Sequence, residues 1–179
     1  MTRHAPNLLT LLRIALVPLF CWLLFSDYQY LSLIVFWVAA TTDFFDGWLA
    51  RKRGLISAFG KLADPIADKA LTGAAWISLS LLGVIAWPAT ILILFREIGI
   101  TVLRLMIAES TVVPASQGGK LKTTLQIVVI SAFLLIPIPA PFPLDVVQSV
   151  LLWTTVAVTL VTGWSYLSVL LPALRASKS

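Results

Sequence analysis

The sequence predicts an all-α protein, a bundle of six transmembrane helices that forms a single membrane domain over residues 1–179. Apolar residues make up 59% of the chain and charged residues 12%, and the mean hydropathy is +0.97. This balance is too apolar for an ordinary soluble domain. The apolar residues also gather in runs of membrane-spanning length, with most charged residues near the ends of those runs.

Six apolar runs follow one another along the chain, and most are close to the about 20 residues with which a helix crosses a bilayer. They cover residues 8–25, 31–49, 66–84, 88–107, 123–136 and 146–171. The first run contains Arg13 and is followed by no small-residue cleavage site, so we interpret it as a retained helix and not as a signal peptide. The fifth run is short, but its helix can gain length on the side of Leu121. We therefore expect six helices and no separate soluble domain.

Lysine and arginine are distributed unevenly between the ends of these runs. If the helices alternate in direction, the basic residues of the loops and termini share one side, and the opposite loops around Asp27, Ala86 and Pro139 contain none. Because cytoplasmic loops carry the excess of Lys and Arg, we expect a bacterial-type cytoplasmic (inner) membrane protein with both termini and the second interhelical loop in the cytoplasm. The formal net charge of +5 favours anionic lipid surfaces. The sequence contains no nucleic-acid-binding motif.

Four aspartates lie where the second apolar run ends and the third begins. Asp43 and Asp46 are three residues apart, so they line one face of a helix. Gly60, Asp64 and Asp68 follow at intervals of four and line one face of the next helix. The linker is short enough to fold these helices back on each other, so the four carboxylates can converge. Since hard divalent cations with oxygen ligands neutralise such a cluster, we predict a metal site for two ions, with its opening on the cytoplasmic side.

The stretch with these aspartates matches the pattern D-x-x-D-G-x-x-A-R, eight residues, then G-x-x-x-D-x-x-x-D at every fixed position. The fixed positions are Asp43, Asp46, Gly47, Ala50, Arg51, Gly60, Asp64 and Asp68. In this pattern the sequence resembles the CDP-alcohol phosphotransferase family. The resemblance implies a six-helix membrane enzyme, commonly a homodimer, in which an acceptor hydroxyl displaces CMP from a CDP-linked lipid or alcohol.

The aspartates suit this chemistry, because two clamped metal ions can hold a diphosphate while one of its bonds is broken. We predict Asp43, Asp46 and Asp64 as ligands, with Asp68 shared between metal ligation and proton abstraction. The resemblance makes Asp68 the general base, and it lies last along its helical face, where an acceptor can approach. All-oxygen ligation and a diphosphate substrate favour Mg²⁺ or Mn²⁺.

Residues between the aspartates are predicted to bind the CDP-lipid together with Asp46. Gly47, Ala50 and Gly60 lack bulk, so a nucleotide can lie close to the helix backbones. Arg51 can reach a phosphate. Close helix packing by small residues is the alternative role of the two glycines.

Basic residues outside the motif are predicted to receive a phosphorylated acceptor. Arg96 and Glu97 lie near the middle of the fourth run, and ionisable residues at that depth are expected to face the bundle interior. The predicted acceptor-phosphate residues are Arg13, Arg96, Arg104, Lys120 and Lys122. In the alternative interpretation, Arg96 and Glu97 pair structurally and the two lysines extend toward the membrane surface.

Four segments resemble one branch of the family, which uses glycerol 3-phosphate as acceptor. These are residues 7–13, 60–69, 96–98 with Arg104, and 119–124. The resemblance implies CDP-diacylglycerol as donor, sn-glycerol 3-phosphate as acceptor, and phosphatidylglycerophosphate and CMP as products, in phospholipid biosynthesis.

Three alternatives remain open at this point. A sibling enzyme would use inositol phosphate, another phosphorylated polyol, or phosphatidylglycerol itself, although a basic pocket argues against the last. A cation transporter could line its path with aspartates, but these lie toward one end of their helices and no inverted repeat is present. A non-catalytic scaffold would leave the spacing of the four aspartates unexplained.

Overall fold

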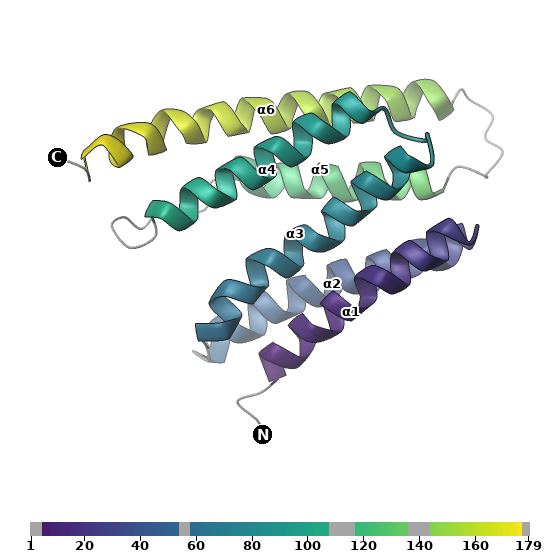
Figure 1. Cartoon of the computed structure of the whole chain (residues 1–179), viewed down its shortest axis with the longest axis horizontal. Helices are drawn as coiled ribbons and strands as arrows, with labels where there is room; N and C mark the ends of the chain where they lie inside the picture. Colours follow the sequence, from purple (N-terminus) through teal and green to yellow (C-terminus); the bar gives the residue numbers. More distant parts are fainter. Residues whose placement is uncertain (1–4, 54–57, 108–116, 136–143, 177–179) are drawn as a thin grey trace. The chain divides into compact units, whose positions relative to one another are not determined.

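The computed structural model describes the backbone of residues 5–53, 58–107, 117–135 and 144–176, and the side-chain surroundings of residues 11–42, 69–103, 121–135 and 144–168. Within these ranges all regular structure is α-helical and forms six helices, whose arrangement along the chain can be followed by their labels in Figure 1. They are α1 (Ala5–Phe25), α2 (Gln29–Arg53), α3 (Ala58–Leu81), α4 (Trp87–Ile107), α5 (Gln117–Leu134) and α6 (Leu144–Ala176). The predicted all-α class with six helices is confirmed for this part of the chain.

Each predicted apolar run coincides with one helix, but the helices extend beyond the runs around the aspartate motif. α2 continues to Arg53, and α3 begins at Ala58. These extensions are rich in Ala, Lys and Arg, which are strong helix formers. As a result, both halves of the motif lie on helices. α5 begins at Gln117, so it has the additional length that was expected on the side of Leu121.

Left-handed residues end two of the helices sharply. Gly83 has φ +72°, and its N–H bonds back to the carbonyl of Ser80 at 3.0 Å. The N–H of Val84 reaches the carbonyl of Leu79 at 2.9 Å, which completes a Schellman motif at the end of α3. Asp27, with φ 61°, ends α1 in the same way. These turns fix where the chain leaves α1 and α3.

The described chain forms two compact units, and the first contains α1, α2 and α3. These three helices run in alternating directions and pack against one another (Figure 1). The buried rings of Phe20 in α1 and Phe36 in α2 lie 5.9 Å apart between centroids. Between α1 and α3, Sγ of Cys21 lies 3.7 Å from Oγ of Ser78. α1 is therefore the element that holds the first unit together.

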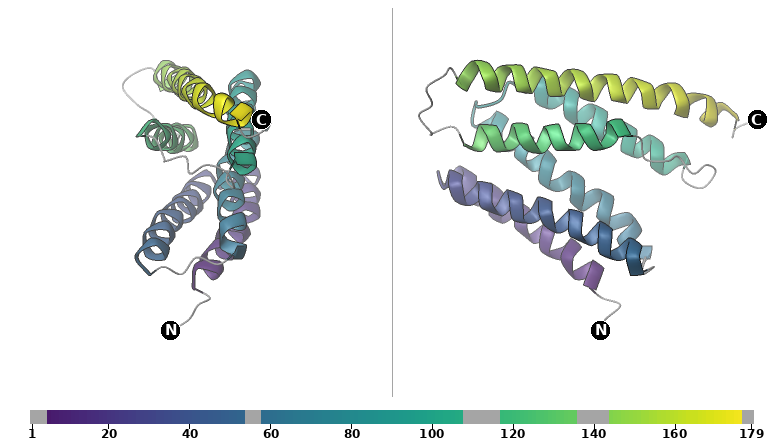
Figure 2. Two further views of the ribbon diagram at one scale, coloured as in Figure 1. Left: turned by 90° about the vertical axis from the view of Figure 1, so that its left-hand side faces the viewer. Right: turned by 180° about the vertical axis from the view of Figure 1, so that it is seen from behind.

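The second unit contains α4, α6 and α5 up to Phe133. Figure 2 shows α4 and α6 running in the same direction, with α5 antiparallel to both. α4 and α6 pack directly on each other, with Ile100 and Tyr166 buried between them. α5 is joined to α6 by a hydrogen bond of 3.0 Å from Nε2 of Gln148 to the carbonyl of Ala132. This unit carries the polar residues described below.

The surface of the described helices is strongly apolar. Among the described residues, Leu144–Ser168 is the one segment that is both long enough and apolar enough to cross a membrane, with a mean hydropathy of 1.7. Shorter apolar helical stretches occupy Leu11–Phe25, Gln29–Thr42 and Leu121–Leu134. Phe95 is 80% exposed and Trp164 is 75% exposed. Such large exposed apolar side chains suit contact with lipid.

Candidate active site

The four motif aspartates lie on two helices, with Asp43 and Asp46 in α2 and Asp64 and Asp68 in α3. Both helices continue through the motif, so the predicted helical spacing is confirmed. At about 100° per residue, residues three or four positions apart project within about 60° of each other around the helix axis. The side chains of all four aspartates lie outside the described residues, and their convergence stays a prediction.

The aspartate carboxylates of α2 and α3 are suitable ligands for a hard divalent cation. All four groups are carboxylates, whose oxygens are the ligands that Mg²⁺ and Mn²⁺ prefer. α2 and α3 are neighbours within the first unit, so two carboxylate-bearing helices are available to one site. Asp43, Asp46, Asp64 and Asp68 are the residues that could hold the ions.

The residues predicted to bind the CDP-lipid lie on the same two helices. Gly47 and Ala50 are one turn apart in α2, and Arg51 is in the last turn of that helix. Gly60 is in the first turn of α3. The surroundings of these four residues lie outside the described ranges, so their donor-binding role also stays a prediction.

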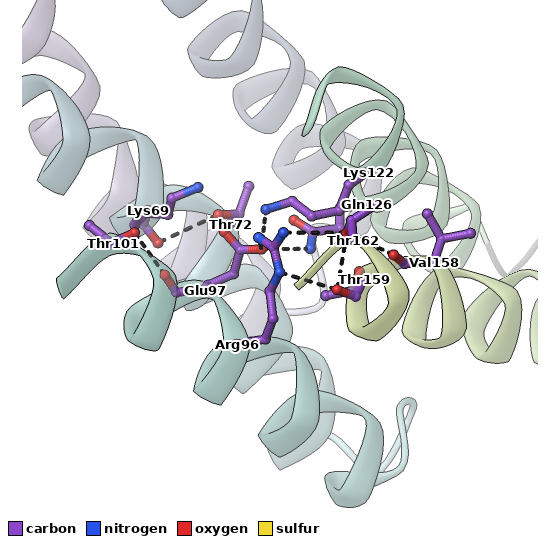
Figure 3. Close-up of polar contacts among 10 residues, drawn as sticks. All are labelled: Lys69, Thr72, Arg96, Glu97, Thr101, Lys122, Gln126, Val158, Thr159 and Thr162. Atoms are coloured by element: carbon purple, nitrogen blue, oxygen red, sulfur yellow. Dashed lines mark hydrogen bonds and ion pairs between the residues drawn. The ribbon is translucent and has the colours of Figure 1, made fainter. Parts of the chain in front are cut away.

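A buried polar network joins α4, α5 and α6 in the second unit, and Figure 3 shows its contacts. We call it the Glu97 network, and it consists of Arg96 and Glu97 of α4, Lys122 and Gln126 of α5, and Thr159 and Thr162 of α6. Glu97 is 5% exposed, Arg96 is 9% exposed and Lys122 is 4% exposed. The prediction that Arg96 and Glu97 face the interior is therefore confirmed. Ionised groups buried to this extent require partners of opposite charge.

One carboxylate oxygen of Glu97 is the shared acceptor of this network. Oε1 accepts hydrogen bonds from Nη1 of Arg96 at 3.3 Å and from Nε2 of Gln126 at 3.4 Å. The Nζ of Lys122 also donates to this oxygen. Because two of the three donors come from α5, this carboxylate ties α4 to α5 (Figure 3).

The guanidinium of Arg96 is held from α6. Its Nε donates to the carbonyl of Thr159 at 3.1 Å, and its Nη2 donates to Oγ1 of Thr162 at 3.3 Å. Its central carbon also lies 5.9 Å from the centroid of the Tyr166 ring, within range of a cation–π interaction. Together with the bond to Glu97, these contacts engage three of the five N–H donors of the guanidinium. At most two N–H groups of Arg96 can therefore point to a substrate phosphate.

The structure brings two of the five predicted acceptor residues together, because Arg96 and Lys122 share Glu97. The structural pairing of Arg96 with Glu97, foreseen as the alternative, does form. Arg13 is buried in α1, with 2% of its surface exposed. Arg104 lies in α4 and Lys120 in α5, and the surroundings of both side chains lie outside the described ranges. An acceptor-binding role for these residues stays a prediction.

Sequence reasoning missed the neutral members of the network. Gln126 follows Lys122 by four residues on α5, and Thr162 follows Thr159 by three residues on α6. Each pair therefore shares a helical face within an otherwise apolar run. Such spacing marks a polar stripe, and this was the signal that could have revealed these residues.

Comparisons with known proteins agree with the motif. The sequence profile described as CDP-alcohol phosphatidyltransferase matches residues 3–161. A protein of Mycobacterium tuberculosis named "Probable phosphatidylglycerophosphate synthase" is 45% identical over 168 residues, which cover 90% of this chain and 79% of the relative. Proteins named "CDP-diacylglycerol–glycerol-3-phosphate 3-phosphatidyltransferase" are 38% identical in Bacillus subtilis, over 97% of this chain and 98% of the relative, and 38% identical in Rickettsia typhi, over 92% and 95%.

Proposed function

We propose that this chain, which belongs to the CDP-alcohol phosphatidyltransferase family, transfers the phosphatidyl group of CDP-diacylglycerol to sn-glycerol 3-phosphate. The products are phosphatidylglycerophosphate and CMP, and the reaction serves phospholipid biosynthesis. The main observation that supports this proposal is that α2 and α3 remain helical through both halves of the aspartate motif. The names of the chain's relatives refer to this reaction.

The aspartates perform the central chemistry in this proposal. Asp43, Asp46 and Asp64 hold two divalent ions, Mg²⁺ or Mn²⁺, and Asp68 contributes to the same site. Bound there, the ions neutralise the diphosphate and the charge that develops during transfer. Asp68 accepts the proton of the acceptor hydroxyl. As the hydroxyl oxygen bonds to the phosphorus of the phosphatidyl group, the bond from that phosphorus to the CMP oxygen breaks, and CMP leaves with the electron pair.

Donor and acceptor are recognised by different helices. Asp46, Gly47, Ala50 and Arg51 of α2, with Gly60 of α3, bind the CDP-lipid. A small residue at three of these positions lets the nucleotide approach the helix backbone. The acceptor phosphate is bound by Arg13, Arg96, Arg104, Lys120 and Lys122, and the burial of Arg96 and Lys122 supports this assignment, because a buried cation strengthens its contact with an anion.

The chain acts as a single membrane domain of residues 1–179, with all six helices crossing a bacterial cytoplasmic membrane. The length and hydropathy of Leu144–Ser168 and the exposure of apolar side chains on α4 and α6 support this placement. The distribution of Lys and Arg supports cytoplasmic termini and a cytoplasmic active site. Family resemblance supports a homodimer.

Release of CMP from CDP-diacylglycerol, measured against a panel of acceptors, tests the function. We expect the purified protein with Mg²⁺ to use glycerol 3-phosphate in preference to inositol phosphate and to phosphatidylglycerol. Faster turnover with inositol phosphate would assign the chain to a sibling enzyme. If none of the acceptors in the panel leads to CMP release, and the protein instead carries cations across vesicle membranes, the transporter alternative would be supported.

A further inference from the structure

At least two sets of polar contacts attach α5 to its neighbours in the described part of the second unit. One is the hydrogen bond from Gln148 to the carbonyl of Ala132, toward the far end of α5. The other is formed by Lys122 and Gln126, which both donate to Glu97. By contrast, α4 and α6 pack directly on each other. In an apolar environment, side-chain hydrogen bonds of this kind hold helices in register.

The contacts of the Glu97 network form a continuous series of hydrogen bonds and ion pairs that leads from α6 through α4 to α5 (Figure 3). Arg96 is fixed on α6 by Thr159 and Thr162. Arg96 in turn fixes the carboxylate of Glu97, which receives the ammonium of Lys122. A lysine side chain is a flexible stem with a point charge at its end. The ion pair with Glu97 therefore restricts where that charge can lie.

We propose that Glu97 is a positioning residue for the phosphorylated acceptor: it fixes the Lys122 ammonium, and Lys122 makes the contact with the acceptor phosphate. This inference rests on the proposed function, which assigns Lys122 to that phosphate. Glu97 takes one N–H donor of the ammonium and leaves at most two for a phosphate oxygen. Glu97 itself contacts neither substrate. Its role resembles that of the outer carboxylates that orient metal ligands, whose loss typically costs about 10- to 100-fold.

The test is a kinetic comparison of the full-length protein in detergent with Mg²⁺ and saturating CDP-diacylglycerol. Glu97→Gln keeps the shape of the side chain but removes the charge that holds Lys122. We expect the KM for glycerol 3-phosphate to rise about 10-fold or more, by analogy with orienting carboxylates. The kcat and the KM for CDP-diacylglycerol should stay within about twofold of wild type. Asp145→Asn, the same change at an exposed carboxylate of α6, is the matched control and should leave every constant unchanged.

A second pair of variants separates positioning from simple helix attachment. In a Lys122→Gln background, Glu97→Gln should raise the KM for glycerol 3-phosphate much less than it does in the wild type, because Glu97 acts through Lys122 while Arg96 stays fixed by Thr159 and Thr162. If Glu97 only attached α5 to α4, the change would lower the thermal midpoint and kcat in both backgrounds and leave that KM alone. This second pattern would overturn the inference.

Glu97→Asp keeps the test decisive if the glutamine variant does not fold. It retains the charge but withdraws the carboxylate from Lys122 by one methylene. A raised acceptor KM at a normal thermal midpoint supports positioning, whereas a wild-type KM refutes it. Failure of the proposed function looks different, because the wild type itself would then release no CMP with glycerol 3-phosphate. If the wild type does use this acceptor and the Glu97 variants keep its KM, the inference about Glu97 alone fails.

Discussion

Gly163 of α6 lies directly against the side chain of Arg96 in α4. A Cβ atom added at Gly163 would stand 2.9 Å from Cγ and 3.1 Å from Nε of Arg96. The guanidinium cannot simply swing away, because Thr159, Thr162 and Glu97 all bind it. The absence of a side chain at Gly163 is therefore what allows Arg96 to lie between the two helices.

We predict that Gly163→Ala destabilises the protein, because the added methyl displaces Arg96 from its hydrogen bonds. Overpacking of this kind costs about 1–3 kcal/mol. Thermal unfolding in detergent measures the effect. Gly99→Ala in α4 is the matched control: a Cβ there meets nothing within 4 Å, so alanine should be neutral or stabilising by about 0.5–1 kcal/mol. Equal stability of the Gly163 and Gly99 variants would contradict the prediction.

A second prediction concerns the metal ions. Asp43→Asn, Asp46→Asn or Asp64→Asn should each abolish CMP release, because an amide cannot replace the charge of a carboxylate ligand. The variants should remain folded in detergent, as judged by size-exclusion elution and thermal midpoint. A chelator should reproduce the loss in the wild type, and added Mg²⁺ should reverse it. Near-normal activity in a variant with two of these changes would exclude the site.

The helical placement of the aspartate motif was predictable because both the spacing of the aspartates and their charge can be seen directly in the sequence. The i, i+3 and i, i+4 intervals predicted carboxylates on helices, and α2 and α3 do continue through Asp46 and Asp64. The ends of these helices were less predictable. Apolar runs mark the span that suits a membrane, whereas the helix continues wherever the backbone propensity of Ala, Lys and Arg supports it.

The Glu97 network was predictable only in part. Mid-run charges such as Arg96 and Glu97 had to face the interior, because their exposure to lipid is costly. The partner of each charge depends instead on which helices pack together, and periodicity within one helix carries no such information. For this reason the contacts of Arg96 with Thr159 and Thr162 emerged only from the structure.

A third prediction tests topology. Ser57 lies between the second and third apolar runs of the sequence and Pro141 between the fifth and sixth, so the two positions should be on opposite sides of the membrane if the segments rich in Lys and Arg are cytoplasmic. Cysteines introduced singly at these positions, in a Cys21→Ser background, should be labelled by a membrane-impermeant thiol reagent from opposite sides. Cys21 must be removed first because it is the single native cysteine. Labelling of both positions from outside intact cells would show that the proposed orientation is wrong.

The last prediction separates recognition of the acceptor from recognition of the donor. Arg104 and Lys120 are assigned to the acceptor phosphate, so their loss should leave that phosphate under-neutralised. The cost is on the order of 2–5 kcal/mol, as for buried charge pairs at interfaces. Arg104→Ala and Lys120→Ala should therefore raise the KM for glycerol 3-phosphate or remove turnover with it. Binding of CDP-diacylglycerol, measured without acceptor, should stay close to wild type.

Arg51→Ala should have the opposite effect and weaken binding of CDP-diacylglycerol first, because Arg51 lies in the last turn of α2, the helix whose sequence includes Asp43 and Asp46, and is assigned to the donor phosphate. Comparing Arg51→Ala with the Arg104 and Lys120 variants is informative, because each of them removes one positive charge from a helix end. If only the total charge mattered, every variant would weaken binding of CDP-diacylglycerol and of glycerol 3-phosphate alike. If the Arg104 and Lys120 variants keep wild-type kinetics with glycerol 3-phosphate, these residues do not bind the acceptor. The choice of glycerol 3-phosphate would then need another recognition site, whereas the chemistry assigned to the aspartates would stand.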